Sequence, residues 1–269
     1  MPFSEVSKRE SYCLPASNSI TTLGFQLILE ALLSKMKNNS NMRYRIYACL
    51  VALFTLGLAQ HSSAQEAEKT GVIEDIDLSL GAGDGSFLGS LAYQNTWALG
   101  KNDQWRLSYG LRFTLFSGKD MEFYSAPIDY YLIEENTDTL QVANPGQSNL
   151  ALYIGASYVI KNKLELGFNI DALGYTFGGE TEATFLGNNQ KLTTTVNPNQ
   201  PTLLLVGAND RGMIKAEFFV GYQLNENWAA RIGFNNNFVE YKTATELQKG
   251  NTRFRGDPTA PFLAVRYRF

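Results

Sequence analysis

The chain has 269 residues, with 23 basic and 26 acidic side chains and a formal net charge of −3. No basic patch is present, so the composition argues against nucleic acid as a partner. The two cysteines and the single histidine, Cys13, Cys49 and His61, all lie near the N-terminus, and a chain cleaved after them would have no thiol and no imidazole.

Residues 42–65 have the three parts of a secretory signal peptide. The basic start, the apolar core and the small-residue cleavage signal are Arg43 and Arg45, residues 48–59, and Ser62-Ser63-Ala64. The apolar core is shorter than the roughly 20 residues of a membrane-spanning helix. We therefore predict secretion through the inner membrane with cleavage of the signal peptide near Ala64.

Residues 1–41 precede this signal. A secreted protein is expected to begin with its signal peptide, so these residues are unexpected. We interpret them as an N-terminal extension from a mis-called start, with Met36 or Met42 as the true start, or as a disordered segment; a short soluble helix around residues 23–36 is the alternative. Loss of residues 1–65 leaves 17 basic and 23 acidic side chains and a net charge of −6. We expect residues 66–269 to form one folded domain.

The remaining chain alternates between apolar and other side chains with a period of two, which predicts strands. Eight strands are expected, over residues 75–83, 87–99, 105–116, 150–160, 163–177, 213–224, 228–235 and 260–269. The clearest is 213–224, with Ile214, Phe218 and Tyr222 on one face and Lys215 and Glu217 on the other.

The polar face of these strands separates a membrane barrel from a soluble one. It consists mostly of Gly, Ser, Asn, Gln and Thr with a few charges, whereas a water-facing surface is rich in Lys and Glu. Such residues fit a crowded polar interior, and only a closed sheet can span lipid as β-structure. The alternative is a soluble sandwich or a lipocalin-like barrel with its apolar face inside.

The connections alternate in length. Residues 100–104, 161–163 and 225–227 are short, as is the first outer connection at residues 83–86, while 119–147, 178–212 and 243–259 are long. This pattern is typical of an up-and-down barrel with short periplasmic turns and long extracellular loops. The predicted fold class is all-β, an eight-stranded antiparallel up-and-down transmembrane β-barrel.

The inward positions include charged residues, which must pair when buried. A lower group holds Asp77, Glu165, Arg231 and Arg266, and a higher group holds Arg112, Asp171, Lys215 and Glu217. We expect a salt-bridge network that plugs the barrel, because eight strands leave only enough interior space for side chains. The alternative is an ion path lined by these charges.

Aromatic residues and the C-terminal strand also indicate a membrane barrel. Trp97, Trp105 and Trp228 lie on the apolar face beside the short turns, where an aromatic girdle is expected. The last strand carries Leu263, Val265, Tyr267 and Phe269 at alternate positions up to the C-terminal residue. It resembles the C-terminal signal that the barrel-assembly machinery recognises. With this signal, the strand count and the loop asymmetry, the chain resembles the OmpA transmembrane domain and OmpX-like outer-membrane barrels, which implies residence in the outer membrane among lipid and lipopolysaccharide.

No constellation supports catalysis or a cofactor. Enzymes among small outer-membrane barrels rely on a histidine as general base, and the cleaved chain has none. The acidic, aromatic connection 119–147 is either a solvated loop or a surface for an extracellular protein or a divalent cation, although it lacks the ligand spacing of an EF-hand. We predict a structural or surface-interaction role through the outer loops; a narrow porin-like pore or transporter for small solutes is the alternative.

Overall fold

The computed structural model describes residues 72–100, 103–126, 137–187, 190–205, 209–244, 246–247 and 250–269. The expected N-terminal extension and signal peptide lie outside these residues. The described strands belong to one compact unit, Gly71–Phe269. Within the described residues, no helix has the length and apolar character to cross a membrane.

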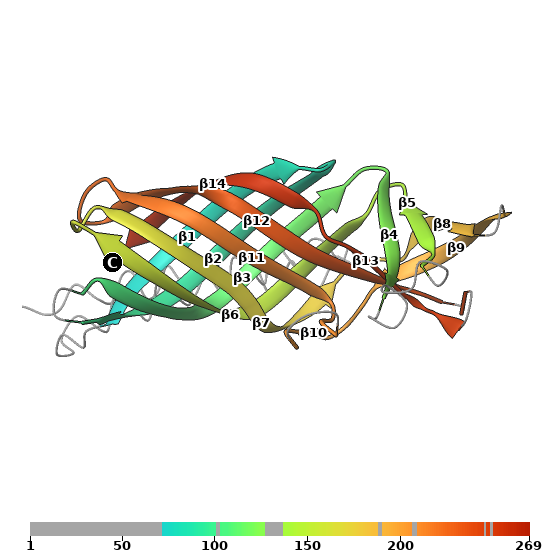
Figure 1. Cartoon of the computed structure of the whole chain (residues 1–269), viewed down its shortest axis with the longest axis horizontal. Coiled ribbons are helices and arrows are strands. Elements are labelled where there is room, and N and C mark those ends of the chain that lie inside the picture. The colour runs from blue at the N-terminus through green and yellow to red at the C-terminus, as the bar shows by residue number, and fades with distance from the viewer. Residues whose placement is uncertain are drawn as a thin grey trace, which may run out of the picture. The chain divides into compact units, whose positions relative to one another are not determined.

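Eight of the described strands form a closed antiparallel barrel, which confirms the predicted fold class (Figure 1). The strands follow one another around the ring in chain order, and the last pairs with the first. They are β1 (Val72–Gly83), β2 (Ser86–Leu99), β3 (Trp105–Gly118), β6 (Gly146–Ile160), β7 (Leu164–Phe177), β11 (Met213–Gln223), β12 (Trp228–Thr243) and β14 (Thr259–Arg268).

The alternation of side chains decides which face of each strand turns inward. Leu78, Phe218, Ile232 and Phe234 on the outer face are all more than half exposed, whereas Asp77, Glu217 and other polar side chains at neighbouring positions are buried. An apolar outside and a polar inside are the arrangement of a barrel that meets lipid. The sandwich and the inward-facing apolar core of a lipocalin-like barrel do not have this polarity.

One bulge interrupts the alternation in β7. Tyr153 pairs with Asp171 while the preceding Leu152 pairs with Leu173, so Ala172 is an extra residue. Because a bulge shifts the two-residue period by one, Asp171 points inward before it and Thr176 points inward after it.

The short connections lie at the end of the barrel that also holds the C-terminus, hereafter the short-turn end (Figure 1). At the opposite end, β1 and β2 meet in a two-residue turn at Asp84 and Gly85, whose φ angles are 47° and 68°. Two residues with positive φ are typical of the tight hairpin turn that matches the twist of the strands. Lys161 and Asn162, with φ of 51° and 57°, adopt the same left-handed region between β6 and β7.

The described parts of the long connections contain further strands, which were not predicted from the sequence. They contain β4 (Met121–Ala126), β5 (Thr139–Val142), β8 (Thr181–Gly187), β9 (Gln190–Pro198), β10 (Thr202–Leu203) and β13 (Arg253–Gly256). Five of them pair in the order β13–β4–β5–β8–β9, and both β13 and β9 pair with β12. This second closed ring of six strands, which we call the distal ring, therefore shares β12 with the barrel.

The distal ring has its own apolar core. Phe123, Leu140, Val142, Val196 and Phe254 are all completely buried and belong to one cluster. In the same cluster lie Leu88, Phe116, Met213, Val239 and Ala260 from the upper part of the barrel. We call these five residues the apolar lid, because they join the core of the distal ring to the top of the barrel interior.

Candidate functional site

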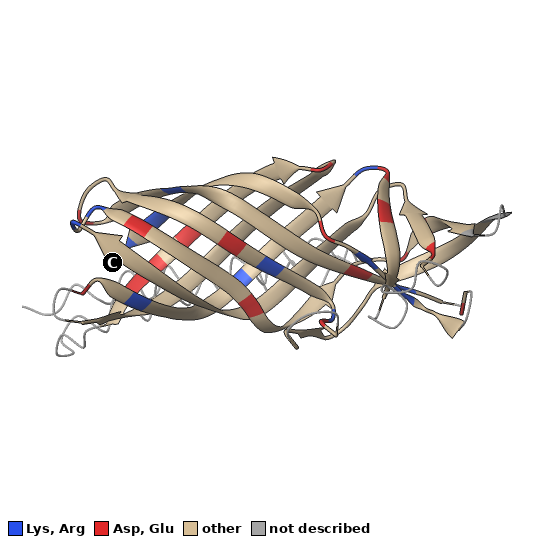
Figure 2. Ribbon diagram, viewed as in Figure 1, with Lys and Arg blue, Asp and Glu red and all other residues tan. Residues whose placement is uncertain are grey.

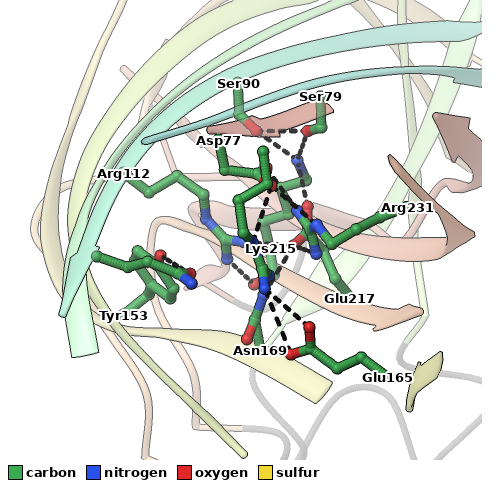
Figure 3. Close-up of polar contacts among 12 residues, drawn as sticks. Asp77, Ser79, Ser90, Arg112, Tyr153, Glu165, Asn169, Lys215, Glu217 and Arg231 are labelled. Atoms are coloured by element: carbon green, nitrogen blue, oxygen red, sulfur yellow. Dashed lines mark hydrogen bonds and ion pairs between the residues drawn. The ribbon is translucent and has the colours of Figure 1, made fainter. Parts of the chain in front are cut away.

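The charged residues expected inside the barrel all occupy inward, buried positions, and charged residues recur along the barrel strands (Figure 2). In Figure 3, side chains from different strands point toward one another across the interior. The eight residues of the two predicted groups are linked by ion pairs into one network: Asp77, Arg112, Glu165, Asp171, Lys215, Glu217, Arg231 and Arg266.

Glu217 lies at the centre of this network. Its carboxylate oxygens are 2.8 Å from Lys215 Nζ, 3.1 Å from Arg112 Nη1 and 3.7 Å from Arg231 Nη1. Lys215 Nζ also donates to the hydroxyls of Ser79 and Ser90, at 3.0 and 2.8 Å. The contact between Glu217 and Arg231 connects the higher group of charges to the lower one.

Arg112 and Asp171 form the closest pair of the higher group. Arg112 Nη2 lies 2.6 Å and Nε 2.9 Å from Asp171 Oδ1. The other carboxylate oxygen of Asp171 accepts a hydrogen bond from the backbone N–H of Lys215, and Arg112 donates to the carbonyl of Lys215. All of these groups are buried. They belong to β3, β7 and β11, so three strands hold the pair.

The lower group has two further pairs. Arg231 contacts both carboxylate oxygens of Asp77 at 2.5 and 2.8 Å, a two-point geometry that fixes orientation as well as distance. Arg266 Nη1 lies 3.0 Å from Glu165 Oε2 and Arg266 Nε lies 3.6 Å from Asp77 Oδ2. Arg231 also stacks over the ring of Phe219, at 4.4 Å from its centroid.

Sequence reasoning missed three charged residues at the short-turn end. Arg106 reaches Glu165 at 3.6 Å, and Arg268 Nε lies 3.1 Å from Asp75 Oδ1. Asp75 and Arg106 could have been found, because each lies an even number of residues from an inward charge on its own strand. Arg268 also meets this condition, because it lies two residues after the inward Arg266 on β14.

A band of unpartnered polar atoms lies near the higher charges. Both amide atoms of Asn235 and of Asn237, and the hydroxyl of Thr114, are buried without a hydrogen-bond partner among the described residues. Asn149, another buried inward asparagine, differs: its amide nitrogen donates to the carbonyl of Met213 at 2.7 Å and its oxygen accepts from Thr202 at 3.1 Å.

The apolar lid lies farther from the short-turn end than the charges. Along β11 the inward residues run Phe219, Glu217, Lys215 and Met213 toward the distal ring, so Met213 is the first apolar residue above the charged layer. Val239 pairs with Met213 and is equally buried. The interior is therefore filled at two levels, first by ion pairs and then by apolar side chains.

A polar cluster ties the distal ring to the barrel rim. Glu240 on β12 is fully buried, and its carboxylate accepts hydrogen bonds from Arg253 at 2.7 Å, from Asn199 at 2.6 Å and from the N–H of Gly212 at 3.1 Å. The neighbouring Tyr241 hydroxyl accepts from the N–H of Gly146 at 2.8 Å.

The predicted aromatic girdle residues all face outward. Trp97, Trp105 and Trp228 are 46%, 59% and 44% exposed and lie near the short-turn end. Each has an aromatic neighbour, Tyr109, Tyr158 and Tyr267 respectively, with ring centroids 4.9 Å apart. The terminal residues Leu263, Val265 and Phe269 are also exposed, and Tyr267 contacts both Trp228 and Phe269.

No group of three or more His, Cys, Asp or Glu side chains within the described ranges is arranged to hold a metal ion. The carboxylates of the barrel interior are instead matched by arginine and lysine. The arrangement can neutralise buried charge and fill the barrel, which are structural tasks.

Comparisons with known proteins found no matching protein-family model and no matching curated protein. Solved structures do match, among them the Neisserial surface protein A, with 10% identity over 74% of this chain and 96% of the other and a TM-score of 0.31. The Yersinia pestis attachment invasion locus protein Ail matches with 10% identity over the same shares and a TM-score of 0.30. A major outer membrane protein from Thermus thermophilus matches with 12% identity, over 74% of this chain and 99% of the other, and a TM-score of 0.35.

These similarities are too low to carry a functional argument. The resemblance to small outer-membrane barrels is confirmed at the level of fold, and it rests on the pairing of the eight strands and on the apolar outside of the ring.

Proposed function

We propose that this chain is an integral outer-membrane barrel that does not conduct solutes and that acts at the cell surface through its distal ring. In this role it binds partners or stabilises the envelope, and it catalyses no reaction. The observation that carries the proposal is the double filling of the barrel, by the buried ion-pair network and by the apolar lid.

The outer surface of the barrel supports a location in the membrane. Side chains that face away from the barrel axis are apolar, and the tryptophans gather near the short-turn end. An even number of strands places the first residue of β1 and the last residue of β14 on one side of the membrane, which is the periplasm in such proteins. The distal ring then faces the outside of the cell. N-terminal sequencing of a heat-modifiable band from outer-membrane fractions tests this, and a first residue near Gln65 is expected.

A folded distal ring supports a surface role more strongly than mobile loops would. It has a closed order of strands and a dry core, and its outer face carries side chains such as Glu122 and Tyr124, whose carboxylate and hydroxyl hydrogen bond at 2.9 Å. A rigid surface loses less conformational entropy when it binds a partner than a flexible loop does.

The narrow pore is the second candidate, favoured by the unpartnered amides of Asn235 and Asn237. Single-channel recording in planar bilayers separates the two. The closed barrel predicts no conductance steps for the purified full chain, because buried ion pairs and apolar side chains fill the interior at two levels. Regular steps from the unaltered protein would overturn the proposal, and an increase only in Glu217→Ala would show that the ion pairs form part of the seal.

The surface role has its own test in a strain that lacks the chain. Uptake of a hydrophobic fluorescent dye should rise in that strain and return to normal when the full chain is restored. Phe123→Ala, which is expected to unfold the distal ring while the barrel stays inserted, should fail to restore it. Complete restoration by Phe123→Ala would show that the barrel alone stabilises the envelope.

A further inference from the structure

The lipid-facing wall of the barrel has a groove of about 670 Å³ over β6, β7, β11 and β12. Phe168, Phe218 and Phe234 line it, and Phe218 and Phe234 are among the most exposed apolar residues of the barrel. Gly167 and Gly233 are also in its lining, at inward positions that both pair with the buried Phe219. The groove is thus an apolar surface that suits a hydrocarbon chain.

One end of the groove is marked by an aromatic pair. Trp105 and Tyr158 both line it, with ring centroids 4.9 Å apart and planes at 62°. Trp105 is the first residue of β3, so this end lies at the short-turn end of the barrel. Tryptophan and tyrosine prefer the level of lipid headgroups, which places the groove across one leaflet with its end at the membrane surface.

Positive charge lies beside that end. Tyr158 is followed, after the last two residues of β6, by the turn that carries Lys161 and Lys163, and both lysines are exposed. The backbone of this turn is fixed, because Lys163 N–H donates to the carbonyl of Ile160 at 3.1 Å. The described turn between β11 and β12, by contrast, carries Glu226 and no lysine.

We propose that this groove is a binding site for one anionic phospholipid of the leaflet at the short-turn end. An acyl chain lies along the phenylalanine-lined channel, and the phosphate lies near Lys161 and Lys163. The charge complementarity of the lysine turn selects an anionic lipid over a zwitterionic one. The proposal requires a membrane-spanning barrel but is independent of whether the interior conducts.

A second copy of the chain is the competing occupant. A symmetric contact through this groove would bring the lysine turns of both copies to the same membrane surface, where like charges disfavour the contact. The anionic lipid instead neutralises them, and it accounts for the groove and the charge together.

The tryptophans provide a built-in comparison. Trp228 and Tyr267 have the same centroid distance and interplanar angle as Trp105 and Tyr158, but they lie beside the acidic turn and outside the groove. Trp97→Phe/Trp228→Phe keeps only Trp105, and Trp97→Phe/Trp105→Phe keeps only Trp228. Each full-length variant is reconstituted in phosphatidylcholine vesicles with increasing amounts of phosphatidylglycerol that has brominated, fluorescence-quenching acyl chains.

Half-maximal quenching of Trp105 is expected at a mole fraction of brominated phosphatidylglycerol about fivefold lower than for Trp228. Lys161→Gln/Lys163→Gln should remove the difference, whereas Lys119→Gln, the loss of an exposed lysine at the far end of the barrel, should preserve it. Equal quenching of the two tryptophans, or a difference that survives the double lysine change, overturns the proposal.

Vesicles of brominated phosphatidylcholine distinguish the absence of an anionic-lipid site from the absence of a membrane-inserted barrel. Both tryptophans should be quenched by that lipid if the barrel is inserted. Quenching of neither overturns the lipid site and the membrane barrel together. Quenching of Trp228 but not of Trp105 means that a second copy covers the groove, which also overturns the lipid site.

Discussion

Glu217 has three ion-pair partners, more than any other residue of the interior network. It is bonded to one lysine and lies near two arginines, all buried. A buried ion pair contributes little net stability when formed, because desolvation offsets attraction, yet removal of one partner leaves an uncompensated charge. Glu217 therefore affects stability most when it is lost.

Glu217→Gln should lower the free energy of unfolding by about 3–5 kcal/mol, since Lys215 and Arg112 would keep their charges without this carboxylate. Denaturant unfolding in detergent micelles, followed by the heat-dependent gel shift, measures the change. Glu226→Gln, in an exposed turn, is the control and should leave the midpoint unchanged. Equal midpoints for the two variants would contradict a central role for Glu217.

The buried asparagines lead to an opposite expectation. Asn237 has no hydrogen-bond partner for either amide atom among the described residues, while Asn149 has two. Leucine is similar in size to asparagine. Asn237→Leu should therefore be at least as stable as the unaltered protein. Asn149→Leu should lose about 1–3 kcal/mol, because the hydroxyl of Thr202 and the carbonyl of Met213 would lose their partner.

The same unfolding measurement compares the two leucine variants. A comparable loss in both would mean that the amide of Asn237 is bonded in solution.

At the scale of elements, the distal ring is the main addition to an otherwise simple barrel. Its strands are short, and they are held by a core in which Phe123 and Tyr241 meet edge to face at 5.1 Å. Short strands are stable only when several pair over a shared apolar face. The ring should accordingly unfold as a unit when that core is disrupted.

Phe123→Ala should destabilise the distal ring by about 3–5 kcal/mol, because it removes a completely buried ring from the core. Tyr124→Ala, at the adjacent exposed position, should change stability by no more than about 0.5 kcal/mol. Limited proteolysis of folded protein in micelles reports on the ring, and the gel shift reports on the barrel. Cleavage of both variants at the same rate would contradict a packed ring.

The barrel strands could be predicted from sequence, but the distal ring could not. In a long strand such as β11, eleven residues repeat one inside–outside pattern, and lipid enforces it on every outward position. β5 has only four residues, and its pairing with β8 joins segments about forty positions apart. Phe123 lies among acidic residues in the sequence. It was therefore included in a connection that was expected to be a solvated loop or a binding surface, although it lies in the core of the distal ring.

The interior charges illustrate the same limit for the site. Alternation predicts which of them point inward, but it does not predict partners, which depend on the stagger between strands. One network with a lower and a higher group was expected, and the contact that links the two groups is the one between Arg231 and Glu217, at 3.7 Å. The bulge at Ala172 adds another shift that no local pattern indicates.

At the scale of the whole molecule, two closed rings stand in series and the interior is filled where they meet. The charged layer and the apolar lid block the passage of solutes in different ways. The charged layer is polar, whereas the apolar lid excludes water. Loss of the ion pairs alone should therefore leave the barrel sealed by the lid. Glu217→Ala/Met213→Ser is expected to conduct in planar bilayers more than either single variant, and equal conductance of all three would contradict two seals in series.

The strand shared by the two rings also has a mechanical consequence. β12 runs for sixteen residues from Trp228 to Thr243, paired with β11 and β14 in the barrel and with β13 and β9 in the distal ring. A pull on the distal ring loads this strand along its length, so that many hydrogen bonds to its neighbours bear the force in shear at the same time. A tether attached to the cell surface through this ring would be anchored by the full height of the barrel.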